Sequence, residues 1–417
     1  MTFRISHVCL LLGGFVAGIA LTSTTSSDFA FVVGGDRLDA LYAGPAAGAS
    51  LAAIVGVLVA ALVRARRILS TLSFAGLALL GVAPATGPWD FEVYLGGVGA
   101  GLLLGGLVGL CATADRAWLQ TALAAGVLTG FLLAGPIDHF WTSAPRRYAD
   151  YLPEPLFEPV TLTLLVLTAV ILAVTLASGD LGDFGERTEV AVSGRALVVG
   201  IVLPLVGLVL YWWFVRRVWN VGSDGAMQVR WMFGLVLVVV VIAASLWLEG
   251  RTGIVLLAAM AFVAAGDIGV AAFPDSWPWL LVAAALVLTG AVLGRRFPQP
   301  VSGIAALAVV AASALFENPP WDTVHFGATW LLLPLAASYA VASSLPSSEP
   351  VSATSLAAPA ALAVPLIADY GWTAYAPLVG SESTLGPDSW AWTSTGLSVA
   401  AVVACGGAAA YLGKRPS

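Results

Sequence analysis

The sequence predicts an all-α, polytopic membrane protein made of two six-helix repeats followed by a two-helix hairpin. Of the 417 residues, 59% are hydrophobic and only 10% are charged, and the mean hydropathy is +0.94. Long apolar runs follow one another with short connections, and their spacing recurs in the second part of the chain. A soluble protein of this composition would expose more apolar surface than water tolerates, whereas a lipid bilayer needs no such covering.

Membrane spans account for almost the whole chain. A helix needs about 20 apolar residues to cross the hydrocarbon core of a bilayer. Fourteen runs meet or approach this length, and the two short ones, 301–316 and 354–369, leave twelve as the alternative count. The first run is interpreted as a retained span, because no clear small-residue cleavage site follows it. The spans are expected near residues 7–26, 43–63, 68–86, 93–113, 117–136, 159–178, 195–215, 231–248, 252–272, 277–294, 301–316, 326–345, 354–369 and 392–412.

The charged residues predict the orientation of these spans. Twelve of the 18 basic residues fall on the side of the N-terminus, and 17 of the 24 acidic residues fall on the other side. Basic residues in short loops are retained in the cytoplasm, so both termini are predicted to lie inside, which requires an even number of spans. We therefore expect a multi-pass protein of the cell membrane, with membrane lipids as its surroundings.

An internal repeat divides the chain. Spans that start at 7, 43, 68, 93 and 117 recur at 195, 231, 252, 277 and 301. Coincidence is the alternative, because short loops force similar spacing on any such chain. The predicted division is a first six-helix bundle over 1–178, a cytoplasmic linker over 179–194, a second bundle over 195–345 and an extra helical hairpin over 346–417.

Two six-helix halves with a central cytoplasmic linker resemble the layout of the major facilitator superfamily, over roughly residues 1–345. Arg64, Arg66 and Arg67 lie in the loop between the second and third spans, where the family carries G-x-x-x-D-R-x-G-R-R. The Asp and Gly of that motif are absent. The resemblance implies that this loop gates the inner face, whereas the simpler interpretation is that these arginines, with Arg251, determine topology.

Acid and histidine pairs occur at two corresponding outer ends. The fifth span and its end, GVLTGFLLAGPIDHF, resemble the Gly-rich fifth helix of the family's proton-coupled exporters, but Asp138 and His139 replace the expected glycines. Glu317 and His325 bracket the matching end of the eleventh span. Histidine titrates near neutral pH, so a proton relay is one hypothesis and a cluster of solvated loop residues is the other.

Other polar residues lie close to the membrane. Asp267 lies inside the ninth apolar run, where it either contacts a neighbouring helix or a coupling cation, or is solvated at the interface. Trp213, Arg216 and Arg217 end the seventh span on the outer side, and Asp28 follows the first span. If these two spans face each other, the residues form an outer gate or hold an anionic group; the alternative is a rim that contacts lipid phosphates.

The sequence favours a transport function over an enzymatic one. It has no G-x-x-x-x-G-K-[ST], H-E-x-x-H or G-x-S-x-G motif, and so predicts no catalytic residue, metal or cofactor, and no nucleic-acid partner. We expect a secondary transporter that moves a small or amphipathic, even lipid-linked, solute by alternating access. The alternatives are a membrane glycosyltransferase that uses a lipid-linked sugar, with Asp28, Asp36 and Asp39 in its first outer loop, and a non-transporting subunit of an envelope-biogenesis complex.

Overall fold

The computed structural model is helical, with no strand among the residues it describes. It describes residues 4–26, 45–86, 91–111, 117–142, 159–181, 193–219, 226–266, 277–317, 320–373 and 389–415. Each of the fourteen predicted runs falls on a helical segment. In chain order the segments are α1 (Ile5–Ser26), α3 (Pro45–Leu62), α4 (Arg66–Val82) with η1 (Ala83–Thr86), α5 (Phe91–Cys111), α6 (Ala117–Thr142), α7 (Pro159–Ala177), α8 (Gly194–Trp219), α9 (Ala226–Trp247), α10 (Ile254–Ala265), α11 (Pro278–Arg296), α12 (Pro300–Ala312) with η4 (Ser313–Phe316), α13 (Asp322–Gly327), η5 (Ala328–Leu332), α14 (Leu333–Ser344), α15 (Glu349–Thr373) and α16 (Ser389–Gly413).

The helices are those of a multi-pass membrane protein. Within the described residues, nine helical segments are long and apolar enough to cross a membrane. Four further apolar helices, α3, α9, α10 and α12 with η4, are shorter. Large apolar side chains such as Val166, Val202 and Val239 are exposed on the outer surface, as expected for residues that face lipid. The choice between twelve and fourteen spans stays a prediction.

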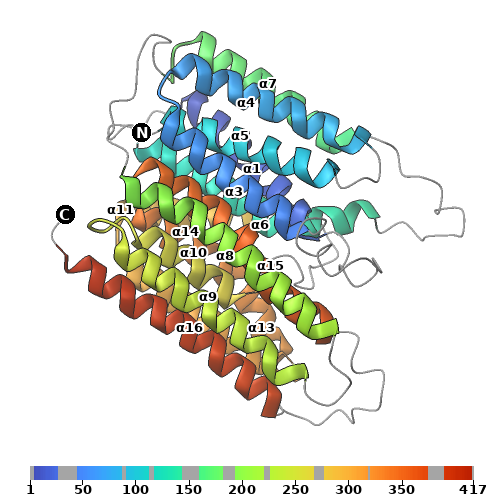
Figure 1. Ribbon diagram of the computed structural model, residues 1–417, viewed down its shortest axis with the longest axis vertical. Coiled ribbons are helices and arrows are strands. Elements are labelled where there is room, and N and C mark those ends of the chain that lie inside the picture. Colours follow the sequence, from blue (N-terminus) through green and yellow to red (C-terminus); the bar gives the residue numbers. More distant parts are fainter. Residues whose placement is uncertain are drawn as a thin grey trace, which may run out of the picture.

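The first six helices form one packed set. α1 packs on α6 and α7, α3 packs on α5, and α4 packs on α5 and α7. The α1–α6 contact is close because it is lined by glycine: a Cβ added to Gly18 would lie 2.5 Å from the carbonyl oxygen of Val127. This set is seen at the blue to green end of the colour scale in Figure 1. The predicted bounds of the first bundle, 1–178, stay a prediction.

The same pattern of contacts recurs later in the chain than the predicted division has it. α10 packs on α15 and α16, α11 packs on α14, and α12 packs on α14 and α16. The second set thus repeats the pairing of the first, element by element in chain order. The places of α1, α3, α4, α5, α6 and α7 are taken by α10, α11, α12, the α13–α14 segment, α15 and α16. The contacts therefore favour a second set over α10–α16 in place of 195–345. Span spacing alone could not indicate this, because it does not record which helices pack together.

The two extra helices are then α8 and α9, between the two sets, and not the C-terminal pair of the predicted hairpin 346–417. α8 packs on α3, α15 and α9, while α9 also contacts α16 and α10. The two sets meet through α3 with α15 on one side, and through α6 with α11 and α14 on the other. We call the contact of α3 with α15 the covered seam, because α8 lies on it, and the contact of α6 with α11 and α14 the second seam.

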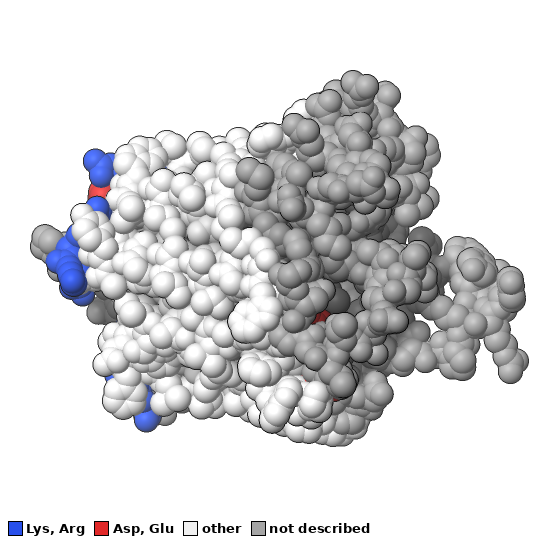
Figure 2. Space-filling model, turned by 90° about the horizontal axis from the view of Figure 1, so that it is seen from below, with Lys and Arg blue, Asp and Glu red and all other residues white. Residues whose placement is uncertain are grey.

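One end of the molecule carries the basic residues. Figure 1 marks both termini at the same end, and Figure 2 shows blue side chains gathered at that end, beside a broad white surface that carries no Lys, Arg, Asp or Glu. In sequence order, the described basic side chains all lie at helix ends or in connections on this side: Arg4, Arg64, Arg66, Arg67, Arg195, Arg251, Arg295, Arg296, Lys414 and Arg415. We call this the terminal end, and it is where the two sets are joined by an ion pair.

Candidate functional site

The candidate site begins with an ion pair between the two helix sets. Arg64 lies in the short connection between α3 and α4, and Glu349 is the first residue of α15. One guanidinium nitrogen of Arg64 lies 2.7 Å from Oε2 of Glu349. The Glu349 side chain is only 5% exposed and that of Arg64 is 24% exposed. The pair therefore holds the covered seam together at the terminal end, largely shielded from water.

The Glu349 carboxylate is only half satisfied. Its Oε2 accepts the hydrogen bond from Arg64, but its buried Oε1 has no hydrogen-bond partner. Glu349 precedes the predicted span 354–369, at the terminal end of α15. Burial raises the pKa of this carboxyl above its ordinary value, and the hydrogen bond and charge of Arg64 oppose that rise only in part. The carboxyl is thus a buried acid that depends on a single cation.

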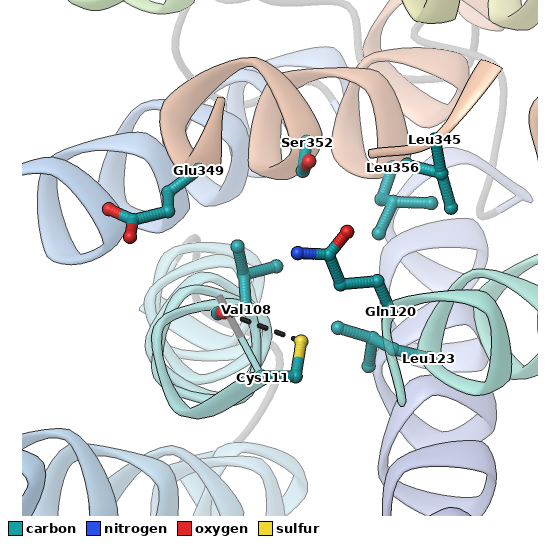
Figure 3. A pocket seen from close by; sticks show the side chains of 8 residues that line it. All are labelled: Val108, Cys111, Gln120, Leu123, Leu345, Glu349, Ser352 and Leu356. Atoms are coloured by element: carbon teal, nitrogen blue, oxygen red, sulfur yellow. Dashed lines mark hydrogen bonds between the residues drawn. The ribbon is translucent and has the colours of Figure 1, made fainter. Parts of the chain in front are cut away.

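A small cavity adjoins the pair, with room for about one water molecule. Gln120 and Leu123 of α6 and Cys111 of α5 line it from the first set, and Ser352 and Leu356 of α15 face them (Figure 3). The Gln120 side-chain oxygen is buried without a hydrogen-bond partner. The thiol of Cys111 donates to the carbonyl oxygen of Val108 at 3.4 Å. The two sets are therefore nearly closed on each other here, around a pocket with an unused polar acceptor.

Two neighbouring contacts reinforce this end. Arg66, which is buried, donates to the carbonyl oxygen of Leu181 after α7, and so ties the start of α4 to the end of α7. Arg295, in the last turn of α11, donates at 3.0 Å to the carbonyl oxygen of Leu345, in the connection between α14 and α15. These arginines bond backbone carbonyls that no helix satisfies. They do more than set topology, because each fixes the end of a helix to a connection.

The other two arginines named with this loop have no such role in the structure. The side chains of Arg67 and Arg251 are both exposed. Arg67 offers only its backbone carbonyl, to the hydroxyls of Ser70 and Thr71. Their positions at the terminal end agree with the interpretation of both as topology determinants.

At the opposite end, His325 of α13 is hydrogen-bonded to η4, the short helix that follows α12. Its Nδ1 lies 3.0 Å from Oγ of Ser313. The Ser313 hydroxyl already donates to the carbonyl oxygen of Val310 at 2.6 Å, so the histidine is the donor in this pair. Glu317 is exposed on the same side, close enough to act on His325 through its charge. The structure thus brings Glu317 and His325 together, and their role in proton transfer stays a prediction.

The remaining predicted residues are only partly described. Asp28 and Asp267 lie outside the described residues. Asp138 and His139 lie in the last turns of α6, and Arg216 and Arg217 in those of α8, but their side chains also fall outside the description.

The predicted outer gate between the first and seventh spans is not favoured by the packing. The main contacts of α8 within the described residues are with α15, α3 and α9, so it lies on a seam and does not face α1 across a mouth. Trp213 of α8 is 45% exposed on the lipid-facing surface, as in the lipid-rim alternative. Any roles of Asp28, Arg216 and Arg217 in binding stay predictions.

Sequence reasoning singled out Arg64 but missed its partner Glu349, and it missed Gln120, Ser352 and Cys111. Glu349 did carry a signal: it is an acid on the predicted inner side, in a short polar connection, SSLPSSEP, between two apolar runs. Such an acid opposes the excess of basic residues on that side and needs a cation nearby. Among the described residues, no group of three or more His, Cys, Asp and Glu side chains is placed to hold a metal ion.

Comparison with solved structures identifies the type of fold. A bacterial homologue of the human drug peptide transporters PepT1 and PepT2 aligns with a TM-score of 0.50 at 14% identity, over 98% of this chain and 97% of that chain. The proton:xylose symporter XylE of the major facilitator superfamily, from E. coli, aligns at 0.46 and 15% identity, over 96% and 94%. The major facilitator superfamily transporter FucP aligns at 0.39 and 13% identity, over 98% and 99%.

No protein-family model and no curated protein matches the sequence. At such low identity, the likeness to the peptide transporter homologue shows the fold alone. The chain shares the helical membrane fold of that peptide transporter homologue.

Proposed function

We propose that this protein is a secondary active transporter that moves its solute by alternating access of the two helix sets. One observation carries the proposal: two helix sets with the same packing pattern meet along two seams, and an ion pair joins them at one end. This pair is Arg64 with Glu349, and among the described residues no ion pair joins the sets at the other end. A link of this kind can be made and broken as that end closes and opens. The transporters with a similar fold support the same function.

The proposal includes an orientation. Basic residues near span ends are retained in the cytoplasm, so the terminal end is the cytoplasmic one. In this arrangement, the Arg64–Glu349 pair and the small cavity beside it close the cytoplasmic side. The membrane is proposed to be the cell membrane.

The solute is proposed to be small or amphipathic, and lipid-linked molecules belong to this class. Few charged residues lie at membrane depth, and 15 tryptophans give the spans many amphipathic contact surfaces. Candidate contacts for the solute or an outer gate are Asp28, Trp213, Arg216 and Arg217. Candidate groups for proton or ion coupling are Asp138, His139, Asp267, Glu317 and His325.

The test is solute flux in vesicles that contain the purified protein, under an imposed proton gradient. The panel should include sugars, peptides and lipid-linked compounds. A matched control uses the variant Arg64→Cys with Glu349→Cys, in a background without the native cysteines, before and after treatment with a short bifunctional thiol reagent. We expect at least one solute to give flux above empty vesicles, and we expect the cross-link to abolish that flux.

The two outcomes that contradict the proposal differ in what they exclude. Flux that survives complete cross-linking would contradict the gating role of the Arg64–Glu349 pair. No flux across the panel, in protein shown to be folded by a single sharp thermal transition, would contradict transport and favour a non-transporting subunit.

A further inference from the structure

α8 lies on both helix sets at once. It packs on α3 of the first set and on α15 of the second, and these two helices pack on each other. Its buried residues recur at helical spacing from the first turn to the fifth, so one face is covered along that length: Ala196, Val199, Gly200, Leu203, Pro204, Gly207, Leu210 and Tyr211. The opposite face, with Val198, Val202, Leu205 and Val209, is exposed. α8 thus lies along the covered seam, with one face packed on both sets and the other face exposed.

Individual contacts place α8 over the line where the two sets meet. A Cβ added to Gly200 would collide with a methyl group of Val57 in α3 and would lie 2.8 Å from the hydroxyl oxygen of Thr354 in α15. The hydroxyl of Ser50 in α3 donates at 3.2 Å to the carbonyl oxygen of Pro204. One turn further on, Gly207 approaches the carbonyl oxygen of Ala361 in α15, at 3.7 Å from an added Cβ.

The two seams differ in this respect. On the second seam, α6 packs on α11 and α14, and within the described residues no third helix makes comparable contacts with both sides. Separation of the covered seam would have to break the close contacts of α8 with at least one set. Separation of the second seam breaks only the contacts of its own helices. The energetic resistance to opening is therefore unequal on the two sides of the molecule.

We propose that α8 ties the two helix sets together along the covered seam. The sets pivot about its contacts with α3 and α15, and they part at the second seam and at the Arg64–Glu349 pair, which lies beyond these contacts at the terminal end. The proposal rests on the proposed alternating access and adds where its axis lies. The tie keeps its contacts with α3 and α15 throughout the cycle. An amphipathic solute that moved between lipid and the protein interior would then cross at the second seam.

Two disulfides test whether α8 stays fixed to both sets. In a background with Cys9→Ala, Cys111→Ala and Cys405→Ala, the first variant carries Val57→Cys and Gly200→Cys with Thr354→Ala, and the second carries Gly200→Cys and Thr354→Cys with Val57→Ala. The alanine in each variant makes room for the side chain added at Gly200. Oxidation joins α8 to the first set in one variant and to the second set in the other. We expect each cross-linked protein to keep flux within about twofold of its reduced form. Loss of flux on oxidation of either variant would overturn the proposal, because α8 would then move against that set.

A second measurement does not depend on transport. The rate of disulfide formation in each variant is compared with and without the further change Arg64→Ala, which releases the terminal end. The proposal predicts that Arg64→Ala leaves the rate of disulfide formation unchanged in each of the two variants. A drop of tenfold or more in either pair, or failure of a pair to form its disulfide in the membrane, would overturn it. Absence of flux in every variant, with unchanged disulfide rates, would instead contradict the proposed function and leave the tie supported.

Discussion

Replacement of Arg64 by alanine should open the terminal end, and the geometry sets the size of the effect. The change leaves the Glu349 carboxylate 5% exposed with no partner on either oxygen, because Oε1 already lacks one. Removal of one member of a buried ion pair costs about 3–5 kcal/mol. Arg64 is partly hydrated, so we take about 3 kcal/mol, at the lower end. At about 1.4 kcal/mol for each factor of ten, the open form gains on the order of 100-fold in relative population.

Glu349→Gln is the matched control and should have a smaller effect. It leaves Arg64 without its carboxylate, but the arginine is 24% exposed and can recover contact with water. Exposed partners of ion pairs contribute about 1 kcal/mol or less, so the open form should gain less than tenfold. Both variants remove the same ion pair. The difference between their open-form populations therefore measures the cost of leaving the buried acid without a partner.

The assay uses a thiol that the chain already has. Cys111 is 1% exposed and lines the cavity beside the pair. With Cys9→Ala and Cys405→Ala as background, the rate at which a maleimide labels Cys111 reports how often this end opens. We expect on the order of 100-fold faster labelling in Arg64→Ala and less than tenfold in Glu349→Gln. Equal rates in the two variants, or a larger rate in Glu349→Gln, would refute the reasoning.

The defect in Arg64→Ala should also depend on pH in a defined direction. Burial already raises the pKa of Glu349, and loss of Arg64 removes what lowers it, so the pKa rises further. A carboxyl whose pKa is raised in the closed form favours that form at low pH, because it binds its proton there, and disfavours it as pH rises through the pKa. The thiolate is the reactive form of cysteine, so each rate is divided by the rate for the unfolded protein at the same pH. This normalised labelling of Cys111 in Arg64→Ala should slow as the pH is lowered, and a normalised rate that rises or stays constant at low pH would contradict this account.

Three further predictions concern stability, each measured by thermal unfolding in detergent. Gly126→Ala places a methyl group against the carbonyl oxygen of Leu11 and should destabilise by about 1–3 kcal/mol, whereas Gly96→Ala, with open space around it, should be neutral or stabilising; equal effects would contradict the packing of α1 on α6. Arg66→Gln should cost about 1–3 kcal/mol, because the carbonyl oxygen of Leu181 loses its buried donor. Tyr339→Phe removes the 2.7 Å hydrogen bond to the carbonyl oxygen of Phe297 and should cost about 1 kcal/mol, so an unchanged or higher melting temperature would count against this bond.

The sequence predicted the helices well, because apolar length is a local property. Each of the fourteen predicted spans falls on a helix, including the short run 354–369 that lies within α15. The division into two bundles was not predicted correctly in its second part, because the contacts that define it join distant helices. The pairing of α10 with α15 and α16 leaves no mark on span spacing. α8 is the seventh span in the sequence, but it does not pack as the first helix of the second set; α10 does.

The candidate site was half predicted for a similar reason. Arg64 stood out through its loop and through the resemblance to the family, but its partner is 285 positions away. The sequence marks Glu349 only as an acid on the predicted inner side. Its partner becomes evident once the fold brings the start of α15 to the connection after α3. Gln120 and Ser352 are ordinary polar residues on apolar helices, and only their meeting across a small cavity distinguishes them.

The connection before Glu349 is short, and this has a mechanical consequence. α14 ends at Ser344 and α15 begins at Glu349, so four residues join them, and a chain of that length reaches only about 14 Å when fully stretched. Arg295 pins the first of these residues, Leu345, to the last turn of α11. If the first turn of α15 moves away from Arg64, the last turns of α11 and α14 must therefore move with it. Three helices of the second set are thus coupled to the Glu349 carboxylate, so this set would move as a rigid body.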